Sequence, residues 1–276
     1  MTATCSKGRT RIMGILNVTP DSFSDGGRFI TEAAIREQAA SMIAAGADII
    51  DIGGESTRPF APEVELGEEL RRVLPAIAAV RELDPEIPIS IDTTKAAVAK
   101  EALAAGADII NDISALGHDP AMVELAAEGQ WPVIIMHMQG TPGDMQLDPS
   151  YKDVVGEIKE FLSRRVEELA ARGIEPERLI LDPGIGFGKT LEHNLEILRR
   201  LAEFKELGRP LLLGHSRKSF LAKVLGDMPM GERDLPSAVV TALCAGRGVD
   251  IIRCHDVLST HRALSLAAAL QERHRG

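Results

Sequence analysis

The sequence predicts an α/β fold, a single (β/α)8 TIM barrel, and two observations support that prediction. Eight short apolar runs alternate with helical patterns along the 276 residues, which is typical of a parallel sheet covered by helices. One unit also recurs three times, as AAGADIIDIGGES from Ala44, AAGADIINDIS from Ala104 and AGRGVDIIRCHD from Ala245. A barrel of this type takes about 250 residues, so the chain is long enough; an open doubly wound sheet is the alternative architecture.

Each copy of the repeated unit predicts a junction between a helix and a strand. A glycine that can stop a helix in the left-handed conformation is followed by a short β-branched run and then by polar residues. Five further runs are typical of strands: RIMGILNVT from Arg11, IPISIDTT from Ile87, PVIIMHM from Pro132, LILDPG from Leu179 and PLLLGHS from Pro210. Apolar residues at three- and four-residue spacing predict helices within 31–46, 65–83 and 151–173.

Composition indicates a soluble globular protein, with 45% hydrophobic and 26% charged residues. No linker divides the chain, so we expect one domain, residues 1–276, with residues 1–11 as a loose N-terminal tail. The net charge of -10 argues against nonspecific nucleic-acid binding, and no apolar run approaches the roughly 20 residues of a membrane span. No secretory signal is recognisable, and Cys5, Cys244 and Cys254 suggest neither a disulfide framework nor a zinc site. We therefore expect a cytoplasmic protein.

The stretch LDPGIGFGKT, residues 181–190, resembles a nucleotide-binding loop at first sight. A P-loop needs G-x-x-x-x-G-K-[ST], but counting back from Gly188 places Pro183 where the first glycine is required. The dinucleotide pattern G-x-G-x-x-G fails too, because Gly184, Gly186 and Gly188 stand at every second position. These glycines therefore need another explanation.

Polar residues gather where the predicted strands end, which in a barrel of this kind is the location of the active site. Asp92, Asn111 and Asp182 would face one mouth, and this trio suits a flat heterocycle with an amide and an amino-pyrimidine edge. Positive charge is expected nearby from Arg58, Lys218, Arg253 and His255, which could hold a phosphate or diphosphate with the assistance of Asn17. Ser219, where a helix follows a strand, is a candidate for binding an anion such as a carboxylate.

At this point the chain resembles the dihydropteroate synthase family from residue 12 to about residue 260. The resemblance rests on long signatures in the family's order: MGILNVTPDSFSDGG, DIGGESTRP, IDTTK, NDIS, MHMQGTP, LDPGIGFGKT, SRKSF and RCHDV. It implies the condensation of 6-hydroxymethyl-7,8-dihydropterin diphosphate with 4-aminobenzoate, which gives 7,8-dihydropteroate and diphosphate in folate biosynthesis. It also implies that the glycines after Asp182 form a loop that passes close to the substrates.

The resemblance further implies roles for particular residues. The pterin would be held by Asp92, Asn111, Met136, Asp182, Lys218 and Arg253. The diphosphate would be bound by Asn17, Thr57, Arg58, Arg253 and His255, with Mg²⁺ bridging it to Asn17. The 4-aminobenzoate site would be shaped by Phe23, Pro59, Phe187 and Ser219. Catalysis would depend on Arg58, Asp92, Lys218, Arg253 and His255, and the loops that carry Asp25 and Arg58 would act as lids.

Departure of diphosphate from a methylene attached to an electron-rich pterin can leave a stabilised cation, which suggests an SN1-like route. The resemblance also suggests a homodimer formed through late helices such as the one after Val257. Phe60 stands where the family usually has glycine. Its bulk predicts either simple surface packing or a narrower 4-aminobenzoate site that disfavours sulfonamides, which sulfonamide inhibition constants of Phe60→Gly would distinguish. Two other functions are considered, a non-catalytic pterin-binding paralogue and a methyltransferase that binds a methylated folate for a corrinoid partner.

Overall fold

The structure, a computed structural model, describes residues 9–19, 31–56, 61 and 63–272. Its strands are β1 (Arg11–Asn17), β2 (Ile49–Gly53), β3 (Ile89–Asp92), β4 (Ile109–Asp112), β5 (Val133–Met136), β6 (Leu179–Asp182), β7 (Leu212–Leu213) and β8 (Ile251–Cys254). Its α-helices are α1 (Glu32–Ala44), α2 (Leu66–Leu83), α3 (Ala96–Ala104), α4 (Pro120–Glu128), α5 (Val154–Ala171), α6 (Leu191–Arg199), α7 (Ser219–Leu225), α8 (Asp234–Cys244) and α9 (Val257–Glu272). Short 3₁₀ helices are η2 (Pro176–Arg178), η3 (Leu201–Leu207) and η4 (Met230–Glu232).

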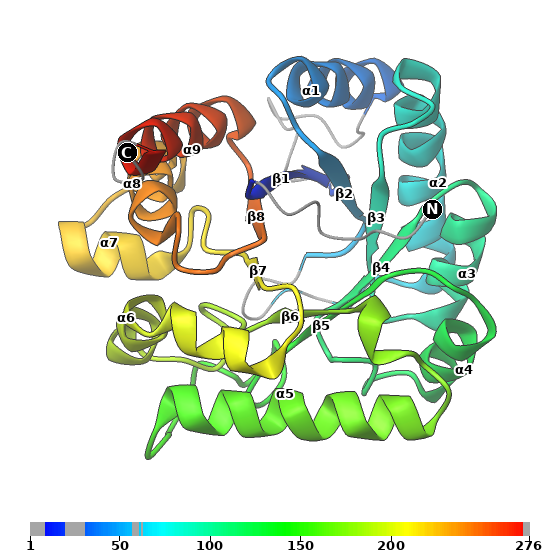
Figure 1. Ribbon diagram of the computed structural model, residues 1–276. Helices are drawn as coiled ribbons and strands as arrows, with labels where there is room; N and C mark the ends of the chain where they lie inside the picture. The colour runs from blue at the N-terminus through cyan, green and yellow to red at the C-terminus, as the bar shows by residue number, and fades with distance from the viewer. Residues whose placement is uncertain (1–8, 20–30, 57–60, 62, 273–276) are drawn as a thin grey trace.

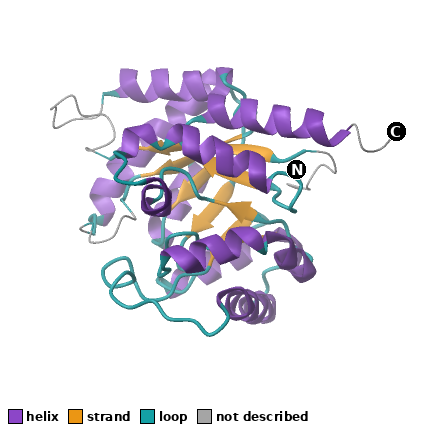
Figure 2. Ribbon diagram, turned by 90° about the vertical axis from the view of Figure 1, so that its left-hand side faces the viewer, coloured by secondary structure: helices purple, strands orange, loops and turns teal. Residues whose placement is uncertain are grey.

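The strands form one eight-stranded sheet in the order β6-β5-β4-β3-β2-β1-β8-β7, and every pair in it is parallel. A parallel bridge between Leu181 and Leu211 joins β6 to the residue before β7 and so closes the ring. Figures 1 and 2 show the helices arranged around the strands. The predicted TIM barrel is therefore confirmed, and the open doubly wound sheet is excluded.

The barrel interior is divided into an apolar layer and a polar layer. Alternate residues of a strand face the same side, and the residues of the apolar layer pack into one buried cluster: Met13, Ile49, Ile109, Ile134, Ile180, Leu212 and Ile251. Two residues further along most of these strands lie the residues of the polar layer: Asp51, Asn111, Met136, Asp182, Gly214 and Arg253. Strand register adds Asp92 to the polar layer, because it pairs with Gly53 on one side and Asn111 on the other.

The repeated sequence unit has a structural role at the opposite end of the barrel. In each copy, the aspartate before the strand accepts a hydrogen bond of 2.8 Å from the backbone N–H of a residue on a neighbouring strand or beside it. The pairs are Asp48 with Ile12, Asp108 with Ile89, and Asp250 with Leu211. The three aspartates therefore fasten the amino-terminal ends of the strands, far from the polar layer.

The last three residues of the expected N-terminal tail, residues 1–11, are not loose but contact the barrel. Arg11 begins β1, the hydroxyl of Thr10 donates a 2.9 Å hydrogen bond to the carbonyl of Val249, and Nη1 of Arg9 donates one of 2.9 Å to Asp48. Residues 9–11 are therefore held against the barrel, because their polar groups find partners at its base.

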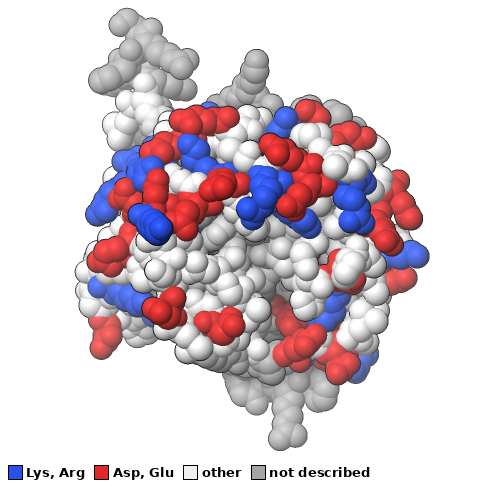
Figure 3. All heavy atoms as spheres, turned by 90° about the horizontal axis from the view of Figure 1, so that it is seen from below, with Lys and Arg blue, Asp and Glu red and all other residues white. Residues whose placement is uncertain are grey.

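Three further features complete the description. Figure 3 shows one face on which acidic and basic side chains stand side by side. No helix within the described part of the chain is long and apolar enough to cross a membrane. Cys244 and Cys254 are buried free thiols.

Candidate active site

The three polar residues that the sequence places at one mouth do lie together. Asp92 pairs in register with Asn111, and Met136 pairs with Asp182 on the next two strands. All four side chains are nearly buried, with at most 8% of their surface exposed. They therefore form a continuous arc on β3 to β6, with three hydrogen-bonding groups and one apolar thioether.

Arg253, on β8, connects this arc to Asp51 on β2, the strand that pairs with β3. Its Nε donates to Oδ2 of Asp51 at 2.6 Å, and its Nη2 donates to Oδ2 of Asp92, also at 2.6 Å. The amide nitrogen of Asn111 contacts the carboxylate of Asp51 at 3.2 Å and 3.3 Å. Asp51 is thus a central member of the polar layer that the sequence analysis missed, although a carboxylate in the middle of the apolar run IIDIG was a usable signal.

Burial and neighbouring charges shift the pKa values of the polar layer. Burial raises the pKa of Asp92 to about 7; Asp51 adds to this shift, and Arg253 opposes it. Burial lowers the pKa of Lys218 to about 8, against the opposing effect of Asp182. Burial likewise raises the pKa of Asp182. Groups that change charge near neutral pH and face one mouth are typical of a catalytic site.

The glycine-rich stretch is a tightly packed loop after β6 and not a phosphate cradle. Gly184, Gly186 and Gly188 all have positive φ, at +69°, +84° and +61°. A Cβ on Gly184 would lie 2.0 Å from the carbonyl oxygen of His137, and one on Gly188 would lie 2.2 Å from that of Gln139. Glycine is therefore required twice over, by the backbone conformation and by the close approach of the segment after β5.

Lys189, which stands where a P-loop would have its lysine, is 1% exposed and holds this loop in place. Its Nζ donates 2.8 Å to the carbonyl of Phe187 and lies 3.1 Å from Nδ1 of His137. Burial lowers the pKa of Lys189 well below its usual value, against the opposing effect of Asp182. Burial, with Lys189 acting in the same direction, lowers the pKa of His137 to about 3. Neither residue was predicted as part of the site, because their contact joins two different loops.

The segment after β7 presents Lys218 and Ser219 beside the β6 loop. Nζ of Lys218 donates to the carbonyl of Ile185 and lies 4.5 Å from the centre of the Phe187 ring. Arg217 has φ +57°, and it is held there by a two-bond ion pair with Asp234 at 2.6 Å and 2.8 Å. Ser219 begins α7 and is exposed. The strained turn therefore points Arg217 toward α8 and Lys218 toward the barrel.

His255 and Asn17 complete the expected anion-binding group among the described residues. Nδ1 of His255 lies 2.9 Å from the hydroxyl of Ser216, and Asn17 ends β1 opposite Gly53. A Cβ on Gly53 would lie 3.5 Å from Oδ1 of Asn17 and 3.5 Å from Cβ of Asp92. The missing side chain thus keeps the space between Asn17 and Asp92 open.

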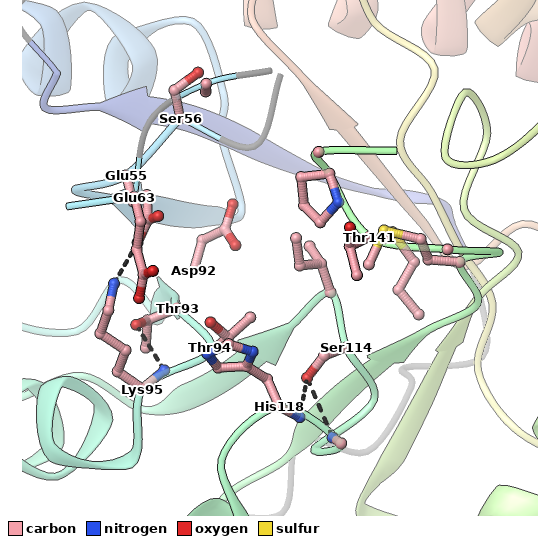
Figure 4. A pocket seen from close by; sticks show the side chains of 18 of the residues that line it. Glu55, Ser56, Glu63, Asp92, Thr93, Thr94, Lys95, Ser114, His118 and Thr141 are labelled. Carbon is pink, nitrogen blue, oxygen red and sulfur yellow. Dashed lines mark hydrogen bonds and ion pairs between the residues drawn. The ribbon is translucent and has the colours of Figure 1, made fainter. Parts of the chain in front are cut away.

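A cavity of about 540 Å³ opens beside Asp92 and Met136, on the side of the loops after β2 to β5 (Figure 4). At its rim Lys95 contacts Glu55 and, at 2.7 Å, the fully buried Glu69. This volume is in the range of small-molecule sites. Lys95 also ties Glu55, two residues before Thr57, to helix α2.

Several predicted site residues lie outside the described residues. They are Phe23, Asp25, Thr57, Arg58, Pro59 and Phe60. Their expected roles stay predictions.

Together, the barrel and its polar layer define an enzyme site that can hold a flat heterocycle beside an anion, and comparison with known proteins identifies the class. The family model for pterin binding enzymes matches residues 13–255. A dihydropteroate synthase from Synechocystis sp. is 48% identical over 262 residues, which are 95% of this chain and 90% of that protein.

Solved structures agree with this match. Dihydropteroate synthase from Yersinia pestis, in complex with a sulfonamide drug, has a TM-score of 0.91 and 43% identity, covering 99% of this chain and 100% of that one. The Xanthomonas albilineans enzyme in complex with 7,8-dihydropteroate has a TM-score of 0.86 and 40% identity, covering 97% and 95%. This chain therefore belongs to the dihydropteroate synthase family of pterin binding enzymes, which are transferases.

Proposed function

We propose that this enzyme joins 6-hydroxymethyl-7,8-dihydropterin diphosphate to 4-aminobenzoate, forming 7,8-dihydropteroate and releasing diphosphate. The observation that supports it most is the polar layer, in which Asp92, Asn111 and Asp182 lie in one mouth of the barrel. Arg253 and Lys218 lie in the same mouth. Carboxylates can accept paired N–H donors from an amino-pyrimidine edge, and the amide of Asn111 can serve a ring carbonyl or N–H.

The pterin ring is assigned to the arc of Asp92, Asn111, Met136 and Asp182. Nearly buried hydrogen-bonding groups discriminate strongly, because a ligand without matching donors would leave them unpaired. Met136 supplies an apolar surface at the same level. Lys218 and Arg253 would border the ring and complete the pocket.

The diphosphate is assigned to Asn17, Arg253 and His255, together with the predicted residues Thr57 and Arg58. Within the described residues no group of three or more His, Cys, Asp or Glu side chains could hold a metal ion. A single amide oxygen beside the open space at Gly53 instead suits Mg²⁺ that takes most of its ligands from the diphosphate and water. Mg²⁺ bound there would neutralise charge on the leaving diphosphate.

The reaction needs charge stabilisation and positioning more than covalent help from the protein. The bond between the pterin methylene carbon and the diphosphate oxygen breaks, and its electron pair leaves with the oxygen. This leaves a cation at the methylene carbon, and the electron-rich pterin ring shares its positive charge. The ionised carboxylate of Asp92 stabilises that charge. The amine nitrogen of 4-aminobenzoate bonds to the methylene carbon and loses its proton to water or diphosphate. This is an SN1-like route without a covalent enzyme intermediate.

The 4-aminobenzoate is assigned to the space between the β6 and β7 loops. Phe187 there lies under Nζ of Lys218, and the exposed Ser219 begins α7, so an aromatic wall and polar donors stand together. Phe23 and Pro59 are the predicted residues on the opposite side. Held in this way, a neutral arylamine needs position more than activation.

A homodimer would cover an apolar surface on α8 and α9, the two helices that pack against each other. On α8, Leu235, Val239 and Leu243 recur every four residues and are 72%, 50% and 63% exposed. On α9, Leu266 and Leu270 are 65% and 69% exposed. Such stripes on adjacent helices are typical of a helix-to-helix interface between copies of one chain.

The proposal also covers organisation and location. One closed sheet supports treating residues 1–276 as one domain. We assign the enzyme to the cytoplasm, where the buried free thiols of Cys244 and Cys254 stay reduced.

Diphosphate release from the purified protein tests the function. The pterin diphosphate and Mg²⁺ are supplied with and without 4-aminobenzoate, while dihydropteroate is followed by chromatography. Equal amounts of diphosphate and dihydropteroate are expected only when both substrates are present. Pterin binding without either product would refute catalysis and indicate the non-catalytic paralogue.

A further inference from the structure

Asp51 is a buried carboxylate that the proposed reaction leaves without a role. It lies in the middle of β2, is 0% exposed and points into the barrel below Asp92. A ligand that enters from the mouth meets Asp92 and Asn111 before it could reach Asp51. Direct contact between Asp51 and a substrate is therefore not expected.

The partners of Asp51 are residues that we assign to the substrates. Its carboxylate accepts from Nε of Arg253 at 2.6 Å, lies 2.6 Å from Nη2, and is also contacted by the amide nitrogen of Asn111. The same Nη2 reaches Asp92 at 2.6 Å. Because a guanidinium is planar with donors in fixed directions, contacts at both Nε and Nη2 fix the rotation of its plane.

Asp51 also constrains the amide of Asn111. The amide nitrogen of Asn111 lies 3.2 Å and 3.3 Å from the two carboxylate oxygens of Asp51, so the amide oxygen is directed elsewhere. An asparagine at position 51 could accept or donate, and this constraint would disappear.

We infer that Asp51 is a positioning residue, which sets the orientation of Arg253, and secondarily of Asn111, for the pterin substrate without touching it. This inference rests on the proposed function, since it concerns residues assigned there to the substrate. Residues that orient a ligand-binding group commonly change activity by about tenfold to a hundredfold when replaced. The contacts at 3.2 Å and 3.3 Å to Asn111 are longer than those to Arg253, so most of the effect is assigned to Arg253.

A double-mutant cycle tests whether Asp51 acts through Arg253. The four proteins are wild type, Asp51→Asn, Arg253→Lys and the double variant; lysine keeps the charge but cannot bridge two carboxylates with a planar fork. The cycle is measured in kcat/KM for the pterin diphosphate and in Kd for 6-hydroxymethylpterin, a probe without diphosphate. Asp51→Asn should lower kcat/KM and weaken Kd about tenfold or more in wild type, and less than about twofold in the Arg253→Lys background.

Asp112→Asn is the matched control. Asp112 is an equally buried strand carboxylate on β4, but it accepts from the backbone N–H of Ser114 at 2.7 Å and not from Arg253. Its effect should multiply with that of Arg253→Lys, as for independent sites. Circular dichroism of every variant verifies folding.

Equal losses for Asp51→Asn in both backgrounds would overturn the inference and make Asp51 a general stabilising residue. Wild type that binds 6-hydroxymethylpterin but forms no dihydropteroate would refute the proposed function instead. In that case the Kd cycle still decides the role of Asp51.

Discussion

Replacing Gly184 with alanine should separate the effect of backbone conformation from that of close packing. Gly184 has φ +69°, and an added Cβ would lie 2.0 Å from the carbonyl oxygen of His137. The backbone of His137 cannot easily move away, because its N–H donates a hydrogen bond of 3.0 Å to the carbonyl of Asp182. The β6 loop must therefore move away from the segment after β5.

The expected magnitude follows from two contributions. The left-handed conformation costs a residue with a Cβ about 1 kcal/mol. Displacement of a packed loop by a contact this short should bring the total loss in unfolding free energy to about 4 kcal/mol, at the upper end of single substitutions. Gly208 is the matched control: its φ is +66°, but nothing lies within 4 Å of its added Cβ.

Thermal unfolding and 4-aminobenzoate kinetics measure the difference. At about 2–4 °C per kcal/mol for a chain of this size, Gly208→Ala should lower the Tm by about 3 °C and Gly184→Ala by about 10 °C. Only Gly184→Ala should raise the KM for 4-aminobenzoate, because the loop that moves carries Phe187. Equal Tm losses in the two variants would refute the argument that close packing explains this glycine.

Three further predictions concern the reaction and the assembly. Asp92→Asn should lower kcat about a hundredfold to a thousandfold, as for the loss of a group that stabilises developing charge. The Kd for 6-hydroxymethylpterin should change far less. Equal losses in kcat and in affinity would assign Asp92 to binding alone. Asp92 must be ionised and Lys218 protonated, so kcat/KM for the pterin diphosphate should fall as pH decreases below about 7 and again as it rises above about 8; a pH-independent profile across this range contradicts these assignments. Leu243→Lys on the exposed stripe of α8 should halve the molar mass of the protein measured by light scattering. Lys223→Ala on α7, outside the stripe, should leave the molar mass unchanged. An unchanged molar mass in both variants would argue against this interface.

The sequence predicted the barrel and the arc of Asp92, Asn111 and Asp182 because these features follow from local patterns. Each residue stands at or near the end of an apolar run, and the ends of parallel strands lie at one mouth. The three helices expected within 31–46, 65–83 and 151–173 are likewise confirmed as α1, α2 and α5, since their apolar spacing is local information.

Asp51 and Lys189 escaped prediction because their roles depend on contacts between distant segments. Asp51 and Arg253 are 202 residues apart and meet only because β8 lies beside β1 in the closed barrel. Lys189 and His137 are 52 residues apart. The sequence excluded a P-loop at Lys189 by spacing, but it could not reveal that the loop packs on the carbonyls of His137 and Gln139.

If Arg253 binds the diphosphate and Asp92 the pterin ring, as proposed, the ion pairs of the polar layer link recognition of the two halves of the substrate. Arg253 is shared between Asp51 and Asp92, so a diphosphate bound at Arg253 would interact with an arginine that also pairs with carboxylates. A pterin ring that donates N–H groups to Asp92 would compete with Nη2 of Arg253 for that carboxylate and so turn part of the guanidinium toward the diphosphate. Arg253 keeps its orientation during this exchange only if a second group holds the guanidinium. Asp51, buried below the proposed position of the ring and out of its reach, can be that group.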